Sequence, residues 1–180
     1  MVDARILKSK AKVRASFIEL LQTRELKDVT IRDVSALSGV GYSTFYRHYA
    51  TKEELLAEIA EFEVSELVDQ SYPALLAGPA IEVCRFTARH IESRRKLWTA
   101  LTSGTAAAIL REKITAATLK YASHAKIGSG FFPLEMGGAM SATIMVELLG
   151  WWLRQDEHSS PEYLAEALDR MIVEPAFKCW

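Results

Sequence analysis

Hydrophobic residues recur every three or four positions along almost the whole chain, which is the spacing of one face of an α-helix. Between residues 5 and 23 this spacing places four apolar side chains on one face: Val13, Phe17, Leu20 and Leu21. Residues that favour strands nowhere alternate with polar residues for long enough to predict a strand. The pattern therefore predicts an all-α protein.

Two short helices are predicted after the first. Thr30 and Asp33 have the spacing of a capping box, which predicts a helix over 31–38. Gly39 comes next, at the position where a positive φ is needed, and Gly39-Val40-Gly41 leaves room for a tight turn into a second helix over 42–48. We expect six residues to pack the pair together: Ile31, Val34 and Leu37 from the first, and Val40, Phe45 and Tyr49 from the second.

The rest of the chain predicts longer helices. Thr51 and Glu54 form a second Thr-x-x-Glu start, before a helix that carries Leu55, Leu56, Ile59 and Phe62 on its apolar face and reaches about Gln70. Pro73 and Pro79 interrupt the segment after this helix. Further helices are expected over about 80–93, 96–102, 105–122 and 134–155, and after the Ser160-Pro161 cap. Residues 126–133 contain Gly128 and Gly130 and predict a loop.

Composition narrows the class of protein. The 180 residues are 49% hydrophobic and 25% charged, with no apolar run of 18 residues, so a globular chain without a membrane span is expected. The first ten residues are basic and polar and do not resemble a secretory signal, which predicts a cytoplasmic protein. Cys84 and Cys179 form no C-x-x-C pair and predict a buried side chain and a free thiol.

Charge is unevenly distributed along the chain. Up to Lys52 there are ten basic and five acidic residues, whereas the remainder holds twelve and eighteen. A basic head on an acidic body is expected where only the head meets a polyanion such as DNA. Solvated, charged helix faces explain the same excess equally well, so charge alone does not decide between these two interpretations.

The two short helices carry the functional signal. Their order, with a glycine-containing turn between them and aromatic and basic residues at the end of the second, is that of a helix-turn-helix that places its second helix in the major groove of DNA. The run Thr30-Ile-Arg-Asp-Val-Ser-Ala-Leu-Ser-Gly-Val-Gly-Tyr-Ser-Thr-Phe-Tyr-Arg-His-Tyr-Ala-Thr-Lys-Glu-Glu-Leu-Leu56 closely resembles the signature of TetR-type transcriptional regulators. The resemblance covers about Ile6 to Val68 and is only loose in the C-terminal part.

The resemblance implies a homodimer with a helix-turn-helix domain over 5–70 (motif 30–49) and a helical effector-binding and dimerisation domain over 71–180. It also implies repression from a palindromic operator that a small molecule relieves. One departure is that the family usually has Ser and then Gly around the start of the second helix, where this chain has Gly41 and Ser43. Glycine is a usable N-cap, so we expect that helix to form.

Positions matching the motif give the predicted DNA-binding residues. Tyr42, Ser43 and Thr44 are candidates for contacts with base edges or nearby phosphates. Tyr46 and His48 are expected at phosphates, as is Lys52 at the start of a helix. Arg32 and Arg47 fit either role, because an arginine can read guanine or hold a phosphate.

The C-terminal part suggests two further roles. The helices spanning 136–152 and 163–172 have strong apolar faces, and Gly137-Gly138 permits close approach, so the pair fits half of a four-helix dimer interface or else an internal core pair. Six aromatic or histidine residues fit the lining of an apolar effector site, although aromatic residues are more often simply core: Phe86, His90, Trp98, Tyr121, Trp151 and Trp152.

Catalytic interpretations find little support. The four histidines are isolated, and neither a zinc-binding H-E-x-x-H nor a phosphate-binding G-x-x-x-x-G-K-[ST] occurs. We therefore expect no enzymatic activity, no cofactor and no metal site. The main alternative is a DNA-binding regulator with no small-molecule inducer, which is controlled by a protein partner, constitutive or activating.

Overall fold

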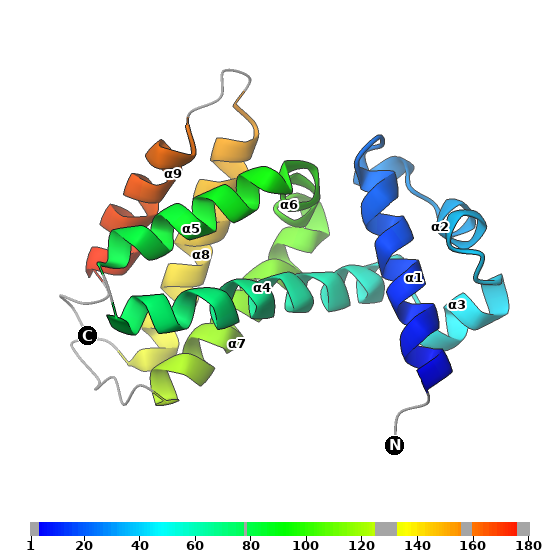
Figure 1. The fold of residues 1–180 in the computed structure, drawn as a ribbon, viewed down its shortest axis with the longest axis horizontal. Coiled ribbons are helices and arrows are strands. Elements are labelled where there is room, and N and C mark those ends of the chain that lie inside the picture. Colours follow the sequence, from blue (N-terminus) through cyan, green and yellow to red (C-terminus); the bar gives the residue numbers. More distant parts are fainter. Residues whose placement is uncertain (1–3, 78, 125–132, 156–159, 176–180) are drawn as a thin grey trace. The chain divides into compact units, whose positions relative to one another are not determined.

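The chain is all-helical. We describe it from a computed structural model, which covers residues 4–77, 79–124, 133–155 and 160–175. These residues fold into helices α1 to α9 with short turns, and no strand occurs among them (Figure 1). The prediction of an all-α fold is thereby confirmed. Contacts between residues divide the chain into two compact units, Met1–Ile59 and Ala60–Trp180, and the division falls inside α4.

The N-terminal unit holds α1 (Ala4–Leu21), the short 3₁₀ turn η1 (Leu26–Asp28), α2 (Ile31–Ser38), α3 (Tyr42–His48) and the start of α4 (Lys52–Ala77). Helix α1 packs against α2, and α2 packs against α3. The two short helices lie where the sequence predicted them. Helix α3 forms behind Gly41, whose extended backbone makes it the N-cap, so the departure from the family pattern does not prevent the helix.

The local signals around α2 act as expected. The Thr30 hydroxyl accepts from the Asp33 N–H at 3.2 Å, and the Asp33 carboxylate accepts from the Thr30 N–H at 3.0 Å. These reciprocal bonds satisfy backbone donors that the first turn leaves without partners. Gly39 ends the helix with a φ of +67°, a left-handed conformation that favours glycine.

Tertiary packing buries most of the predicted core of this unit, although Leu20 and Ile31 are only half-buried. Its most buried side chains come from all four helices and the turns between them: Val13, Phe17, Leu21, Val29, Val34, Phe45, Tyr49, Leu55, Leu56 and Ile59. Leu37, expected on the packing face of α2, is 45% exposed. Ser38 is buried beside it, and its hydroxyl accepts from the Val40 N–H at 3.2 Å in the turn to α3. The face of α2 that packs is thus rotated toward Val34 and Ser38.

Replacing Thr30 with alanine is expected to destabilise the N-terminal unit by about 1 kcal/mol, because the N-cap hydroxyl is lost. The loss depends on pH. Hydrogen bonds from the side chain and backbone of Thr30, followed by Arg24, lower the pKa of Asp33 from 3.8 to about 2. The ionised Asp33 therefore stabilises the folded state above about pH 4, and this contribution disappears as the pH falls toward 2. Hydrogen exchange of residues 30–38 measures the effect.

Thr23→Ala is the matched control. Its hydroxyl also forms a local hydrogen bond, donating from the turn after α1 to the Leu20 carbonyl at 3.3 Å, but it caps no helix start. We expect little change from Thr23→Ala, and a shrinking difference between wild type and Thr30→Ala as the pH falls from 5 to 2. A difference that stays constant over this range would contradict the role of the Asp33 charge.

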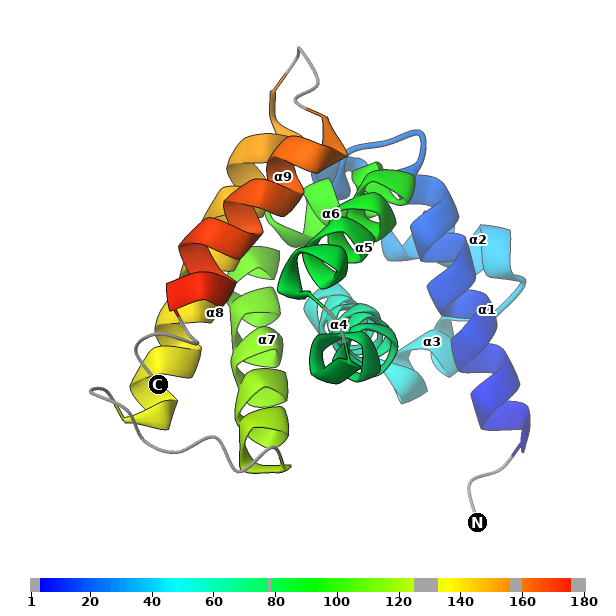
Figure 2. The ribbon, with the colours of Figure 1, turned by 60° about the vertical axis from the view of Figure 1, so that its left-hand side comes forward.

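The C-terminal unit contains the rest of α4, α5 (Ala80–Ser93), α6 (Arg95–Leu101), α7 (Gly104–His124), α8 (Leu134–Leu153), α9 (Pro161–Leu168) and a π-helical turn, η2 (Asp169–Val173). Helix α7 packs along α8, and α5 packs along α9 (Figure 2). The core of the unit is formed by large apolar side chains, among them Ile91, Leu97, Trp98, Leu101, Leu110, Leu149, Trp152 and Leu164. The loop predicted over 126–133 lies almost wholly outside the described residues.

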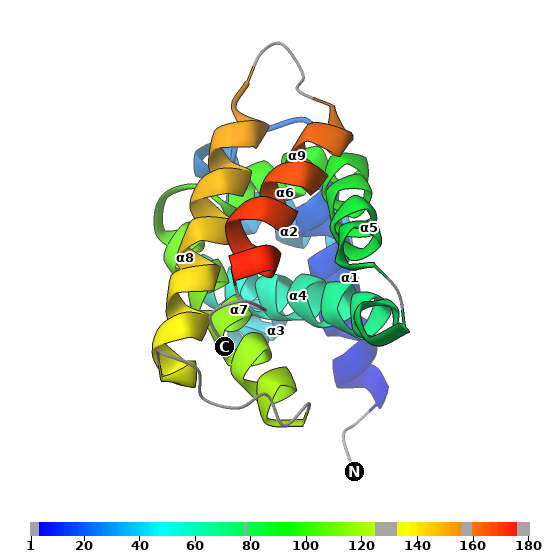
Figure 3. The same cartoon turned by 90° about the vertical axis from the view of Figure 1, so that its left-hand side faces the viewer.

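The first half of α8 buries its small residues and leaves its methionines exposed. Met136 and Met140 are each 47% exposed, whereas Gly137, Gly138, Ala142 and Val146 are buried. A Cβ atom on Gly138 would lie 3.4 Å from Leu119 of α7, so the small residues let the two helices approach closely. Met136 and Met140 are not covered by another helix of the described residues. Figure 3 shows α8 beside α9.

Helix α4 also differs from its prediction. It continues through Pro73 to Ala77, beyond the expected end near Gln70. Phe62, expected in the core, is 40% exposed, whereas the neighbouring Glu63 is completely buried. Ile59, Glu63 and Leu67 follow one another at four-residue spacing, so the buried stripe of α4 passes through a carboxylate.

No helix among the described residues has the length and apolar character needed to cross a membrane.

Candidate DNA-binding surface

Helix α3 turns most of its polar and aromatic side chains outward. Phe45 is completely buried and anchors the helix in the unit. Tyr42 is 47% exposed and Tyr46 52% exposed, and their rings stack with centroids 6.4 Å apart. Ser43 and Arg47 are also exposed, and Thr44 is half-buried. The buried Phe45 thus fixes which side of α3 faces outward.

The two arginines of the predicted site have no internal role. Arg32 of α2 and Arg47 of α3 are exposed, and neither forms a hydrogen bond or ion pair with the described part of the chain. Arg24, by contrast, lies 3.1 Å from the Asp33 carboxylate. A guanidinium without an internal partner keeps all five of its N–H donors for an external one.

Lys52 is partly engaged within the unit. Its ammonium group donates to the carbonyls of Leu26 at 2.9 Å and Val29 at 3.2 Å, which ties the start of α4 to the turn before α2. An ammonium group has three N–H donors, so one is left over. The sequence placed the charge of Lys52 at a helix start, but it did not indicate that the ammonium group binds these two carbonyls.

His48 is also engaged, at the end of α3. Its Nε2 lies 2.6 Å from the Ser9 hydroxyl of α1, and the residue is half-buried. Burial, followed by the positive charges of Arg47 and Lys10, lowers the pKa of His48. The imidazole is therefore neutral at pH 7, and a phosphate would meet it as a hydrogen-bonding group and not as a cation.

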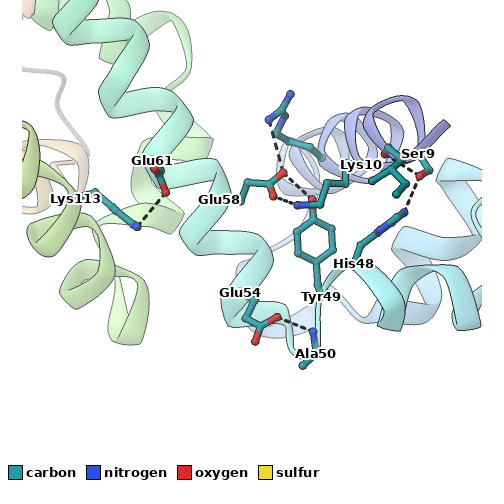
Figure 4. A network of polar contacts seen from close by, with 11 residues as sticks. Ser9, Lys10, His48, Tyr49, Ala50, Glu54, Glu58, Glu61 and Lys113 are labelled. Atoms are coloured by element: carbon teal, nitrogen blue, oxygen red, sulfur yellow. Dashed lines mark hydrogen bonds and ion pairs between the residues drawn. The ribbon is translucent and has the colours of Figure 1, made fainter. Parts of the chain in front are cut away.

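A polar network that the sequence did not reveal joins α1, the end of α3 and α4. Figure 4 shows Glu58 at its centre, accepting from the Tyr49 hydroxyl at 2.8 Å and from the Lys10 ammonium at 2.5 Å. Arg14 approaches the same carboxylate at 3.8 Å. Burial opposes ionisation of Glu58, but the hydrogen bonds from Lys10 and Tyr49 prevail and lower its pKa. Tyr49 directly follows α3, so this carboxylate fixes the end of that helix to α1 and α4.

Comparison with known proteins gives these features a context. Residues 18–59 match the model of the family described as bacterial regulatory proteins, tetR family. The chain is 30% identical over 69 residues to YxbF of Bacillus subtilis, an uncharacterized HTH-type transcriptional regulator. That segment is 38% of this chain but only 18% of the relative.

Solved structures extend the likeness over the whole fold. A TetR transcriptional regulator from Streptococcus agalactiae is 25% identical, with a TM-score of 0.65 over 94% of this chain and 96% of that one. Residues 18–59 thus place the N-terminal unit of this chain in the tetR family, and the described helices share the fold of a TetR transcriptional regulator. A second structure, the TetR-family repressor FadR of Thermus thermophilus in complex with lauroyl-CoA, has the same TM-score at 18% identity. It covers 92% of this chain and 93% of that one, and at that identity it shows the fold alone.

The match to the tetR family over residues 18–59 includes the helix-turn-helix that α2 and α3 form. Membership does not assign individual contacts, so the eight predicted DNA-binding residues stay a prediction. The structure leaves Arg32, Tyr42, Ser43, Tyr46 and Arg47 exposed, and holds Thr44, His48 and Lys52 half-buried.

Replacing Glu58 with glutamine is expected to lower the preference of the protein for specific over random DNA. Lys10 loses its anionic partner and becomes available to phosphates, so we expect the salt dependence of binding to random DNA to steepen by about one phosphate contact. The weaker hydrogen bonds are expected to cost the N-terminal unit about 1 kcal/mol. Fluorescence anisotropy at several salt concentrations measures the first effect and hydrogen exchange the second.

Glu61→Gln is the matched control, because it makes the same change one turn further along α4. Glu61 is exposed and pairs with Lys113 at 3.0 Å within the C-terminal unit (Figure 4). Equal changes in DNA binding from both substitutions would show that net charge, and not the network around Glu58, causes the effect.

The predicted effector residues of the C-terminal unit are only partly brought together. Phe86, His90 and Trp98 lie in succession, with ring centroids 6.3 Å and 6.4 Å apart. Trp151 instead faces Tyr163, 6.2 Å away, and is 43% exposed. Trp152 is buried, with the Arg95 guanidinium 4.8 Å from its ring. The side chain of Tyr121 lies outside the described part of the structure.

The first ring cluster adjoins a buried ion pair that the sequence analysis missed. Arg94 Nη1 donates to both carboxylate oxygens of Glu63, at 2.6 Å to Oε1 and 2.5 Å to Oε2. The Glu63 side chain is completely buried. His90 Nε2 lies 3.6 Å from the same carboxylate, beyond hydrogen-bond range. The available signal was a charged residue within the apolar repeat of α4, although its partner 31 residues away could not be identified from it.

Metal and thiol chemistry find no site in the part of the chain that the structure describes. Within it, no group of three or more His, Cys, Asp or Glu side chains could hold a metal ion. Cys84 is buried, and burial raises the pKa of its thiol to about 12. Cys84 is therefore a buried thiol and not an activated nucleophile. Its burial agrees with the sequence prediction of a buried side chain.

Proposed function

We propose that this TetR-family regulator is a cytoplasmic, homodimeric repressor that binds a palindromic operator and is released from it by a small molecule. The observation that carries DNA recognition is the outward face of α3, where Tyr42, Tyr46 and Arg47 are exposed and the Arg47 guanidinium has no partner among the described residues. The eight predicted residues form the proposed DNA surface, with Arg47 and Arg32 as its cations. We assign His48 and Lys52 to the edge of this surface, because both side chains already form hydrogen bonds within the N-terminal unit.

Uncovered apolar side chains support dimerisation. Large ones are about half exposed on α8, α9 and η2: Met136, Met140, Trp151, Tyr163 and Met171. An exposed apolar surface of this kind typically marks an interaction site. Two copies that meet through these helices would present two α3 helices to DNA, and a palindrome offers two matching half-sites.

Release by a small molecule is supported by the ring cluster of Phe86, His90 and Trp98, which runs from an exposed to a buried ring. The related fold of the Thermus repressor holds lauroyl-CoA, which supports a ligand for this fold without identifying one for this chain. A ligand that favours one arrangement of the dimer shifts the population only by its differential affinity for the two arrangements.

The test begins with DNA selected from a random-sequence library by the full chain. Arg47→Ala is expected to weaken binding to the selected sequence about tenfold or more. Arg89→Ala is the matched control, since Arg89 is an exposed arginine of α5 without a partner among the described residues and lies outside the proposed DNA surface. Equal affinity of wild type and Arg47→Ala would contradict the DNA surface.

Two further measurements test the rest of the proposal. Sedimentation at micromolar concentration is expected to show a species of twice the 20.1 kDa chain, and a single-chain species alone would contradict the dimer. Compounds that raise the melting temperature are then added to the DNA complex. If no compound of a broad library both binds and releases the DNA, the inducer part of the proposal fails.

A further inference from the structure

A line of three rings leads from the surface of the C-terminal unit into its interior. Phe86 is 38% exposed, His90 is half-buried and Trp98 is 1% exposed. The His90 and Trp98 rings meet edge to face, with their planes 80° apart. The rings come from α5 and α6, which also position the buried ion pair through Arg94. An incoming molecule that followed this line would pass from an aromatic edge to a polar interior.

Two ring nitrogens at the inner end of this line have no partner. Trp98 Nε1 and His90 Nε2 are both buried, and neither forms a hydrogen bond with any described residue. Buried polar groups are nearly always paired, so each unpaired one calls for an explanation, and a bound molecule is one. The indole N–H can only donate, whereas an imidazole nitrogen donates when it carries a proton and accepts when it does not. A molecule that pairs with Trp98 Nε1 must therefore supply an acceptor atom.

Local charge is already balanced beside these nitrogens. The completely buried Glu63 carboxylate receives two contacts from Arg94, and it lies too far from His90 Nε2 for a hydrogen bond. A second carboxylate would be repelled by Glu63 and would find Arg94 engaged. A cationic group would lose its hydration on entry and would compete with Arg94 for Glu63. An uncharged ligand avoids both costs.

We propose that the effector is an uncharged aromatic molecule with an oxygen acceptor, and that Trp98 Nε1 donates a hydrogen bond to that oxygen while Phe86 and His90 contact its ring. This inference rests on the proposed function, because it specifies the ligand class of the same effector site. Carbonyl compounds are the simplest members of the class, since their oxygen only accepts.

Three probes of similar size separate the chemistry. Acetophenone carries an uncharged acceptor, ethylbenzene lacks the oxygen, and benzoate carries a charge. The full chain is labelled with ¹⁵N in its tryptophan indoles, and the Trp98 resonance is assigned by its absence from Trp98→Phe. Acetophenone is expected to move the Trp98 indole N–H resonance in a saturable manner, and the other two probes are not.

Calorimetric titration of two variants completes the test. Trp98→Phe keeps an aromatic ring but removes the donor, so it is expected to weaken acetophenone binding about fivefold and to leave ethylbenzene binding unchanged. Trp151→Phe makes the same change at an exposed tryptophan and is expected to alter neither. No saturable binding of acetophenone, equal binding of acetophenone and ethylbenzene, or a preference retained in Trp98→Phe would each overturn the inference.

Failure of the inference is distinguishable from failure of the proposed function. A compound that releases the selected DNA without moving the Trp98 resonance overturns the ligand class and leaves the inducible repressor standing. If acetophenone binds at Trp98 as described but no compound releases DNA, the site is upheld and the inducible repressor is overturned.

Discussion

Replacing Phe45 with alanine is expected to destabilise the N-terminal unit by about 3–5 kcal/mol and to abolish specific DNA binding. Phe45 is completely buried and is the only α3 side chain in the core of the unit, with Tyr49 5.6 Å away and Tyr46 5.7 Å away between ring centroids. A helix of seven residues cannot persist by itself, so its position depends on this anchor. Hydrogen exchange of residues 31–48 and binding to the selected DNA measure the two effects.

Tyr46→Ala is the informative control, because it removes an aromatic ring from the same helix at a position that is 52% exposed. We expect it to weaken DNA binding without increasing hydrogen exchange in α3. All four tryptophans of the chain follow residue 60, so their fluorescence reports on the C-terminal unit alone. If Tyr46→Ala and Phe45→Ala destabilised α3 equally, the burial of Phe45 would not be its anchor.

Replacing Arg94 with methionine is expected to destabilise the C-terminal unit by about 3 kcal/mol. The substitution leaves the completely buried Glu63 without its main partner, and breaking a buried ion pair costs far more than replacing both partners. The value is at the low end of the usual range, because the Arg94 side chain is itself 31% exposed. Denaturant unfolding followed by tryptophan fluorescence measures the change.

The double variant Glu63→Gln with Arg94→Met separates the buried charge from lost packing. We expect it to recover much of the stability lost in Arg94→Met, because no uncompensated carboxylate remains. Arg89→Met is the matched control on α5 and is expected to change stability by less than about 0.5 kcal/mol. A double variant no more stable than Arg94→Met would mean that the methylene groups of Arg94 matter more than its charge.

Interactions between residues close in sequence made much of this molecule predictable. Thr30 and Asp33 cap α2 with bonds that span three residues, and Gly39 adopts the positive φ expected of it. The starts of α3 and α8 also agree with the predicted ranges. These signals act through the backbone of one turn, so they need no knowledge of the partner helix.

The surroundings of the predicted site residues were predictable to a smaller extent. The outward face of α3 follows from the burial of Phe45, which its spacing from Val40 and Tyr49 had indicated. The use of Lys52 and His48 inside the unit was not foreseeable, because their partners are the carbonyls of Leu26 and Val29 and the hydroxyl of Ser9. A charge pattern records that a cation is present but not which acceptor lies within hydrogen-bond range.

The sequence by itself determined an all-helical chain and the bounds of the short helices α2 and α3, and it predicted residues for contact with DNA. Only the tertiary structure decided that α8 buries its glycines and leaves Met136 and Met140 uncovered, and that α4 buries Glu63 in place of Phe62. Helical periodicity shows which side chains share a face, but the partner helix selects the face that is buried. Arg94 lies 31 residues from Glu63 in the sequence and compensates its buried charge. Such a pair forms only when the chain is folded.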